Sequence, residues 1–299
     1  MCRVLTRLIR RPVWKRRISP FLNRALQAYA VGSVFKPVLA AAALEAGLAP
    51  EYDCNGAVVV DGQIFRCAGG VPHGEVDLSA ALAKSCNGYF IRLGQQLGAQ
   101  ALLQQAQAQA LGFGRSIGLA EGLTAQSGAL PGAEELAQSG QLANFSFGQG
   151  SLLATPLQVA AMMNTIANGG VYRAPCLLDC TLDETSGEEL SAFARPQAER
   201  VLTEQTAAAL CTMLEQTVAE GTAQDASGLP GGAAGKTGTA QTGQFTAEGK
   251  ERMNLWFAGF YPAEDPQYTI VVLQDGQTQA AVSSAAVFAQ LCTALHWLG

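Results

Sequence analysis

Three extended runs near the end of the chain constrain its fold more than any other feature. They cover residues 233–242, 255–261 and 268–274, are apolar or alternating, and are separated by turn residues. An amphipathic helix is expected to follow over residues 283–298. Strands joined by such short connections pair antiparallel, so the sequence predicts an antiparallel sheet with a helix packed against it.

The residues before these strands are mainly helical in pattern. Apolar periodicity, caps and glycine stops predict helices within the segments 25–48, 76–97, 99–110, 155–168 and about 203–220. Two short β-prone runs in 54–66 flank Asp61-Gly62, which predicts a hairpin, and 112–150 is expected to be loop-rich. The predicted fold class is therefore α+β: an antiparallel sheet with flanking helices at about 230–299, plus a mainly helical subdomain at about 25–225.

Composition excludes several classes of protein. Of the 299 residues, 48% are hydrophobic and only 14% are charged, which excludes intrinsic disorder. The longest apolar stretch, around 38–48, is interrupted by Glu45, so no transmembrane segment is expected.

Charge is distributed unevenly along the chain. Residues 1–17 carry seven basic groups and no acidic one, which leaves 12 basic and 24 acidic residues, a net charge of −12, for the remainder. The first 20 residues lack the apolar core of a signal peptide, and we expect them to form a poorly ordered basic leader. The acidic remainder argues against nucleic acid as a partner.

Eight cysteines are present, and none of them form a Cys-x-x-Cys pair. Cys54, Cys67, His73 and Cys86 could in principle surround a zinc ion, but their spacings match no known zinc motif, so we expect no metal site. A Cys54–Cys67 disulfide is favoured if the chain works outside the cytoplasm, and unpaired buried thiols are expected if it does not.

The first candidate for chemistry is Ser33-Val34-Phe35-Lys36 at an expected helix start. The spacing of three residues places Ser33 and Lys36 on one helix face, within reach of each other. A serine becomes a nucleophile when a neighbour removes its proton, and a desolvated lysine with a lowered pKa can do so. A surface serine beside a solvated lysine is the alternative interpretation.

Two further candidates are short polar clusters. Ser85-Cys86-Asn87 lies at a break between helical stretches, where a hydroxyl could relay a proton and an amide could hold a substrate, although a helix cap would explain it too. Lys236-Thr237-Gly238-Thr239 follows a glycine-rich run. A phosphate-binding loop is disfavoured there because Pro230 occupies its first glycine position, so an edge strand that presents Lys236 to a carboxylate fits better.

Taken in order, S-x-x-K, S-x-N and K-T-G resemble the signature of penicillin-binding proteins and serine β-lactamases. The flanking segments resemble the transpeptidase domain of class B penicillin-binding proteins, namely FGQG at 147–150, TPLQ at 155–158 and ANGG at 167–170. The resemblance runs from about Phe21 to the C-terminus, which implies one transpeptidase domain over 21–299.

The resemblance implies roles for the first two motifs. Ser33 would attack the carbonyl of a D-alanyl-D-alanine stem peptide and form an acyl-enzyme, with Lys36 as its general base. Ser85 would pass a proton to the leaving D-alanine, and Asn87 would hold the substrate amide. β-Lactams would acylate the same serine, and no cofactor is implied.

The third motif would bind the end of the substrate. By the same resemblance, Lys236 supports the local electrostatics, while Thr237 and Thr239 bind the terminal carboxylate. Gly238 leaves room for the substrate backbone. The backbone N–H groups of Ser33 and Thr239 would form the oxyanion hole.

Members of this family also carry a membrane anchor, a non-catalytic domain and a β-hairpin before the nucleophile helix. The leader contains no such hairpin, so we expect the sheet to lack its N-terminal strands. The resemblance implies the outer face of the bacterial cytoplasmic membrane and other cell-wall synthesis proteins as partners.

Two alternative functions stay open at this point. The chain could be a truncated, non-catalytic remnant or an interaction module. It could also be a serine β-lactamase or β-lactam sensor, which would need a base for deacylation, and Glu121, Glu134 and Glu135 are the acidic candidates.

Overall fold

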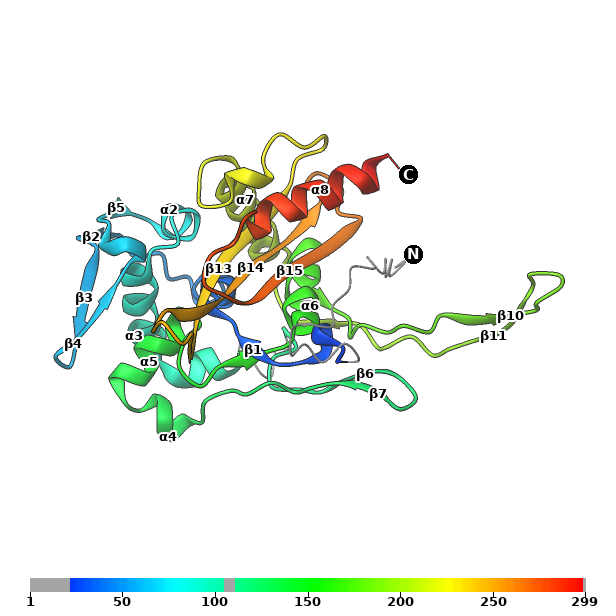
Figure 1. Cartoon of the computed structure of the whole chain (residues 1–299), viewed down its shortest axis with the longest axis horizontal. Helices are drawn as coiled ribbons and strands as arrows, with labels where there is room; N and C mark the ends of the chain where they lie inside the picture. Colours follow the sequence, from blue (N-terminus) through cyan, green and yellow to red (C-terminus); the bar gives the residue numbers. More distant parts are fainter. Residues whose placement is uncertain (1–21, 105–110, 298–299) are drawn as a thin grey trace.

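The computed structural model describes residues 22–104 and 111–297, and a three-stranded antiparallel sheet lies at its centre. The strands are β13 (Ala234–Phe245), β14 (Glu251–Tyr261) and β15 (Tyr268–Gln277), in the order β13-β14-β15. Helix α8 (Ser284–His296) packs on β14 and β15, and Figure 1 shows it crossing in front of the sheet. The predicted α+β fold class is confirmed.

Helix α1 (Lys36–Glu45) is the central helix of the fold and is almost entirely buried among the other helices. It is alanine-rich, and all its residues from Lys36 to Ala43 are buried. A helix with no polar face belongs inside a core, and it packs there against α3 (Asn87–Leu103) and α7 (Glu204–Ala219). Helix α6 (Pro156–Ala167) contacts β14 and β15.

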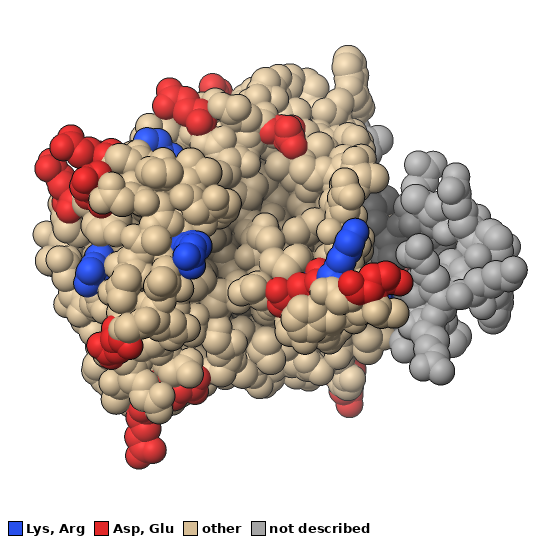
Figure 2. Space-filling view, turned by 60° about the vertical axis from the view of Figure 1, so that its left-hand side comes forward, with Lys and Arg blue, Asp and Glu red and all other residues tan. Residues whose placement is uncertain are grey.

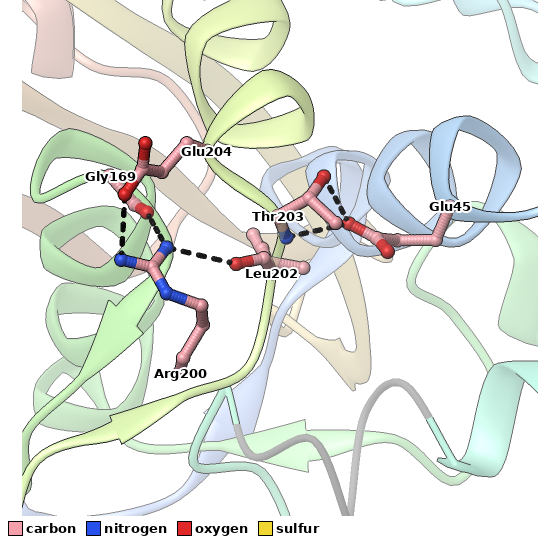
Figure 3. A network of polar contacts seen from close by, with 6 residues as sticks. All are labelled: Glu45, Gly169, Arg200, Leu202, Thr203 and Glu204. Atoms are coloured by element: carbon pink, nitrogen blue, oxygen red, sulfur yellow. Dashed lines mark hydrogen bonds and ion pairs between the residues drawn. The ribbon is translucent and has the colours of Figure 1, made fainter.

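Hydrogen bonds fix the end of α1 against the start of α7 (Figure 3). Glu45 Oε1 accepts from the backbone N and the Oγ1 of Thr203, at 2.9 and 3.0 Å. Burial raises the pKa of Glu45, but hydrogen bonds from Thr203 and Thr206 outweigh burial and hold the pKa below its ordinary value. Arg200 reaches the neighbouring Gly169 carbonyl and the Glu204 carboxylate at 2.8 and 3.0 Å. The C-terminal end of α1 is thus fixed by hydrogen bonds, and its N-terminal end carries Lys36 of the first motif.

A small lobe projects beside α3. Strand β2 (Tyr52–Cys54) pairs with β5 (Gly74–Val76), and β3 (Ala57–Val60) pairs with β4 (Gln63–Arg66). The predicted hairpin turn is present, because Asp61 and Gly62 have φ values of 48° and 79°. Figure 1 shows this lobe at the left, next to the N-terminal end of α3.

The remaining elements are short. They are the helices η1 (Arg24–Leu26), η2 (Gly32–Phe35), η3 (Ala68–Gly70), α2 (Leu78–Ala83), α4 (Ala133–Leu136), α5 (Ser139–Ser146) and η5 (Gln224–Ala226), and the paired strands β1 (Tyr29–Ala30) with β8 (Leu153–Ala154), β6 (Ile117–Ala120) with β7 (Leu123–Ala125), β9 (Val171–Tyr172) with β12 (Glu199–Arg200), and β10 (Cys180–Leu182) with β11 (Glu189–Ala192). The prediction of loops over 112–150 is wrong for α5, whose buried Ala143 and Phe145 pack inward.

Several predictions concern residues beyond the described ones. The basic leader over 1–20 and the second half of the helix expected over 99–110 lie there, while residues 99–103 form the end of α3. Within residues 22–104 and 111–297, the central sheet has three strands, and no helix is long and apolar enough to cross a bilayer. Acidic side chains are spread around the face drawn in Figure 2, in keeping with the net negative charge of this part of the chain.

Candidate active site

Ser33 lies in η2, immediately before the buried helix α1. It is partly exposed, whereas Gly32 and Val34 on either side are buried. Gly32 has a φ of +64°, and its N–H donates to Gly148 O at 2.7 Å. A left-handed backbone favours glycine, so Gly32 and the loop around Gly148 fix the direction in which the chain presents Ser33.

Lys36 begins α1 directly after this turn and is fully buried, and its amine is surrounded by polar partners. Its Nζ donates to the Ser85 carbonyl at 2.7 Å, to Ser85 Oγ at 3.1 Å and to Asn87 Oδ1 at 2.7 Å. The Nζ also lies 5.4 Å from the centre of the Phe90 ring. Residues of the first two motifs, 49 and 51 positions apart in sequence, therefore form one hydrogen-bonded group.

Burial changes the protonation of Lys36. Desolvation lowers its pKa to about 7, although the nearby Cys86 and Cys67 thiols oppose the shift. A large fraction of the side chain is therefore neutral near pH 7. A neutral amine can accept a proton, which a solvated lysine at that pH does not do.

Ser85 and Asn87 are held by the loop between α2 and α3. Ser85 adopts a left-handed φ of 56°, which is uncommon for a residue with a side chain. Cys86 caps α3 by accepting from the Tyr89 N–H at 3.5 Å. Asn87 Nδ2 donates to the Arg66 carbonyl at 2.8 Å, which directs its Oδ1 toward Lys36.

The third motif lies on β13, beside the Ser33 turn. Lys236 is fully buried, and desolvation together with the positive charge of Lys36 holds its pKa well below the ordinary value. Its Nζ donates to the Thr237 carbonyl at 3.0 Å. Thr237 Oγ1 lies 2.7 Å from Thr222 Oγ1, and Thr239 is exposed.

A cavity of about 250 Å³ adjoins this strand. Its lining comes from the three residues that follow Lys236 on β13, from β14, from the start of α8 and the segment before it, and from the region after α7. The lining residues are Thr222, Asp225, Thr237, Gly238, Thr239, Leu255, Trp256, Ala280, Ser283, Ser284 and Ala285. Hydroxyl groups at its wall provide donors of the kind that bind a carboxylate.

The structure explains why position 238 is a glycine, which the sequence alone did not. A Cβ added there would lie 2.8 Å from Val34 Cγ1 and 3.0 Å from Val34 N. We expected the missing side chain to leave room for substrate, but the Ser33 turn itself occupies this space. Glycine lets β13 approach the Ser33 turn closely.

We therefore predict that Gly238→Ala lowers the free energy of unfolding by about 1–3 kcal/mol, because the added methyl overpacks against Val34. Gly118→Ala, on β6 with no atom within 4 Å of its added Cβ, is the matched control and should change little. Chemical denaturation followed by circular dichroism measures both. Equal stability of the two variants would contradict the close approach.

Three residues support the site without having been given a role from the sequence. Phe90 lies under the Lys36 amine, Thr222 pairs with Thr237, and Gly148 accepts from Gly32. Phe90 follows Asn87 by one helical turn, a spacing that could have placed it on the same helix face. Gly148 belongs to the FGQG segment at 147–150, which resembles the family but indicates no contact with Gly32. Thr222 carries no local signal, because its contact is set by the packing of distant segments.

The four residues Cys54, Cys67, His73 and Cys86 do come together behind the Ser85 loop. Their spacing gave no reason to expect this. Cys54 Sγ and Cys67 Sγ lie 3.6 Å apart, and both thiols are free, so the disulfide considered from the sequence is not formed.

Comparison with known proteins agrees with this geometry. The family model of the penicillin-binding protein transpeptidase domain matches residues 9–293. The chain belongs to this family. The match begins before Phe21, where the motif resemblance starts, and the resemblance to a class B penicillin-binding transpeptidase domain is confirmed.

Named relatives and solved structures are similar over most of the chain. Peptidoglycan D,D-transpeptidase PbpA of Mycolicibacterium smegmatis is 32% identical over 283 residues, which is 91% of this chain and 55% of that protein. Stage V sporulation protein D of Bacillus subtilis is 32% identical over 83% of this chain and 38% of its own length. The ceftriaxone acyl-enzyme complex of penicillin-binding protein A from M. tuberculosis has a TM-score of 0.80 at 27% identity, covering 93% of this chain and 62% of that one. The chain thus spans about half the length, or less, of these curated relatives.

Proposed function

We propose that this chain is a serine D,D-transpeptidase that cross-links peptidoglycan stem peptides and is acylated by β-lactams. The buried Lys36 carries the proposal, because its amine has a pKa of about 7 and bonds to both Ser85 and Asn87. A relative of this chain is named as a peptidoglycan D,D-transpeptidase, and a structural neighbour is an acyl-enzyme with a β-lactam.

In the acylation step, neutral Lys36 takes the proton of the Ser33 hydroxyl while Ser33 Oγ bonds to the carbonyl carbon of the penultimate D-alanine. The backbone N–H groups of Ser33 and Thr239 stabilise the resulting oxyanion. The proton on Lys36 then passes through Ser85 Oγ, 3.1 Å away, to the leaving amine as its C–N bond breaks. D-alanine departs and an ester on Ser33 remains.

In the second step an amine of another stem peptide attacks this ester. The nitrogen loses its proton by the reverse path through Ser85 to Lys36, the C–O bond breaks, and Ser33 regains its hydrogen. A new amide links the two peptides. Asn87 holds the donor amide, and Thr237 and Thr239 bind the terminal carboxylate in the field of Lys236.

Acyl-enzyme lifetime separates this proposal from a β-lactamase. Of the acidic candidates for a deacylating base, Glu121 and Glu134 are exposed, and Glu135 accepts from Ser151 Oγ at 2.8 Å. We found no hydrogen bond between any of them and the three motifs in the described part of the chain. We expect a fluorescent penicillin to label the chain for hours. Loss of the label within minutes would favour a β-lactamase, and folded protein that takes no label would favour a non-catalytic remnant.

The pH dependence of acylation tests the role of Lys36. Only the neutral amine accepts a proton, so the acylation rate should rise with pH, with a midpoint near the Lys36 pKa of about 7, and level off above it. Rates with a fluorescent penicillin between pH 5 and 9 measure this, with circular dichroism to confirm folding at each pH. A rate that is flat from pH 5 to 9 would contradict Lys36 as the base.

Family membership also supports a location. We propose that the domain works at the outer face of the bacterial cytoplasmic membrane, where stem peptides are cross-linked, together with other proteins of cell-wall synthesis. A fluorescent fusion that remains inside the cytoplasm of its host would contradict this location.

A further inference from the structure

Four cysteine and histidine side chains, residue types that can bind metals, converge at the junction between the small lobe and α3. Cys54 ends β2, Cys67 follows β4, His73 precedes β5, and Cys86 caps α3. Their ligand atoms all lie within 4.8 Å of one another. The three thiols are buried, with 3% exposure or less, and His73 is partly exposed.

The separations match the edges of a zinc tetrahedron. With Zn–S near 2.3 Å and Zn–N near 2.0 Å, sulfurs lie about 3.8 Å from one another and about 3.5 Å from the nitrogen. Here Cys54 Sγ to Cys67 Sγ is 3.6 Å, Cys67 Sγ to Cys86 Sγ is 3.9 Å, and Cys54 Sγ to His73 Nδ1 is 3.5 Å.

We propose that Cys54, Cys67, His73 and Cys86 bind one structural zinc ion through three thiolates and His73 Nδ1. Four protein ligands leave no open position, which is typical of structural rather than catalytic zinc. Thiolate-rich tetrahedral sites favour zinc over the hard cations magnesium and calcium. A disulfide would use two of the three thiols and leave the third thiol and the imidazole without a role.

Backbone N–H groups at the start of α3 surround the sulfurs. Those of Gly88 and Asn87 hydrogen-bond to the Cys67 side chain. The Tyr89 N–H donates to Cys86 Sγ at 3.5 Å. The N-terminal end of α3 thus directs its free N–H groups at two of the sulfurs, as second-shell donors do in metal sites.

The position of the ion gives it a mechanical role in the proposed active site. Cys86 separates Ser85 from Asn87, and Cys67 follows Arg66, whose carbonyl accepts from Asn87 at 2.8 Å. Ser85 has the uncommon φ of 56°, a conformation that its surroundings must hold. Bound zinc would fix Cys86 and Cys67 together, and so fix both the Ser85 backbone and the Asn87 amide beside Lys36.

Metal content tests the site without reference to activity. The full chain, purified without chelators under reducing conditions, should contain about one zinc per chain by inductively coupled plasma mass spectrometry. Cys54→Ala and Cys86→Ala should each lose most of it, while Cys292→Ala, which removes an equally buried thiol in α8, should keep it. Reduced wild-type protein that neither contains zinc nor takes it up would overturn the proposal, as would a stoichiometric metal other than zinc.

Cobalt substitution tests the ligand set in the wild-type chain, so it does not depend on a variant that folds. Co²⁺ in place of zinc should give the intense visible and near-ultraviolet absorption of a tetrahedral thiolate complex, and added zinc should abolish it. Weak octahedral absorption would overturn the three-thiolate assignment.

The mechanical role rests on the proposed function and has its own measurement. Removing zinc with a chelator should slow acylation by penicillin by about tenfold or more, and returning zinc should restore the rate. An unchanged rate in zinc-free protein would overturn the mechanical role but not the binding site. Zinc-loaded protein that is never acylated would refute the proposed function and leave the metal site standing.

Discussion

Ser33→Ala should remove covalent labelling by a fluorescent penicillin altogether. The substitution takes away one oxygen from a partly exposed side chain and leaves Gly32, Val34 and the buried helix behind them unchanged. No acyl bond can form without that oxygen, so the effect is loss of the product rather than a slower rate. Gel fluorescence and intact mass spectrometry of wild type and variant measure it.

Ser191→Ala is the control for this experiment. Ser191 is exposed on the β10–β11 hairpin, which Figure 1 shows extending away from the sheet, and its removal should leave labelling unchanged. A thermal melt of Ser33→Ala that matches the wild type excludes unfolding as the cause. A stable label that persists in folded Ser33→Ala would place the nucleophile elsewhere, and peptide mapping would then identify it.

The sequence predicted the central sheet because its strands are local patterns. The three strands and α8 were placed to within a few residues, since apolar runs and turn residues are adjacent in the chain. Helix α5 was missed because the sequence around it is rich in glycine and polar residues. Its helical state depends on burying Ala143 and Phe145 against neighbouring segments, which no local pattern reports.

The candidate site, too, could be predicted only in those features that local sequence patterns determine. The motifs identified Ser33, Lys36, Ser85, Asn87 and Lys236 as candidates, yet nothing in the sequence indicated that both lysines are completely buried. Burial gives Lys36 its lowered pKa, so the property on which its proposed role as a base depends arises from tertiary packing.

The cluster of Cys54, Cys67, His73 and Cys86 is a second feature that depends on tertiary packing and could not be predicted from the sequence. The intervals that separate its four members match no known zinc motif. They come together only because β2, β4 and β5 fold back on the start of α3. Sequence motifs for zinc sites rely on ligands that are close together in the chain, whereas these four residues are spread over the small lobe and the start of α3.

Lys36→Met should slow acylation by penicillin by about a hundredfold to ten-thousandfold, the usual contribution of a positioned general base. Methionine fills similar space but accepts no proton. The fold should tolerate the change, because a buried lysine carries a desolvation cost that methionine does not. Ser85 and Asn87, which lose a hydrogen-bond donor, are partly exposed and can bond to water instead. We therefore expect a thermal midpoint equal to or above that of the wild type.

Two further variants separate proton transfer from charge. Lys36→Arg keeps a cation that stays protonated, so it should be as slow as Lys36→Met if the neutral amine is what matters. Lys250→Met, at an exposed lysine, should acylate at the wild-type rate. Second-order rate constants over several penicillin concentrations, with melts of every variant, provide the comparison. The predicted loss corresponds to a rise in the activation free energy of about 3 kcal/mol or more. A folded Lys36→Met that acylates within threefold of the wild-type rate would show that another group accepts the proton of Ser33.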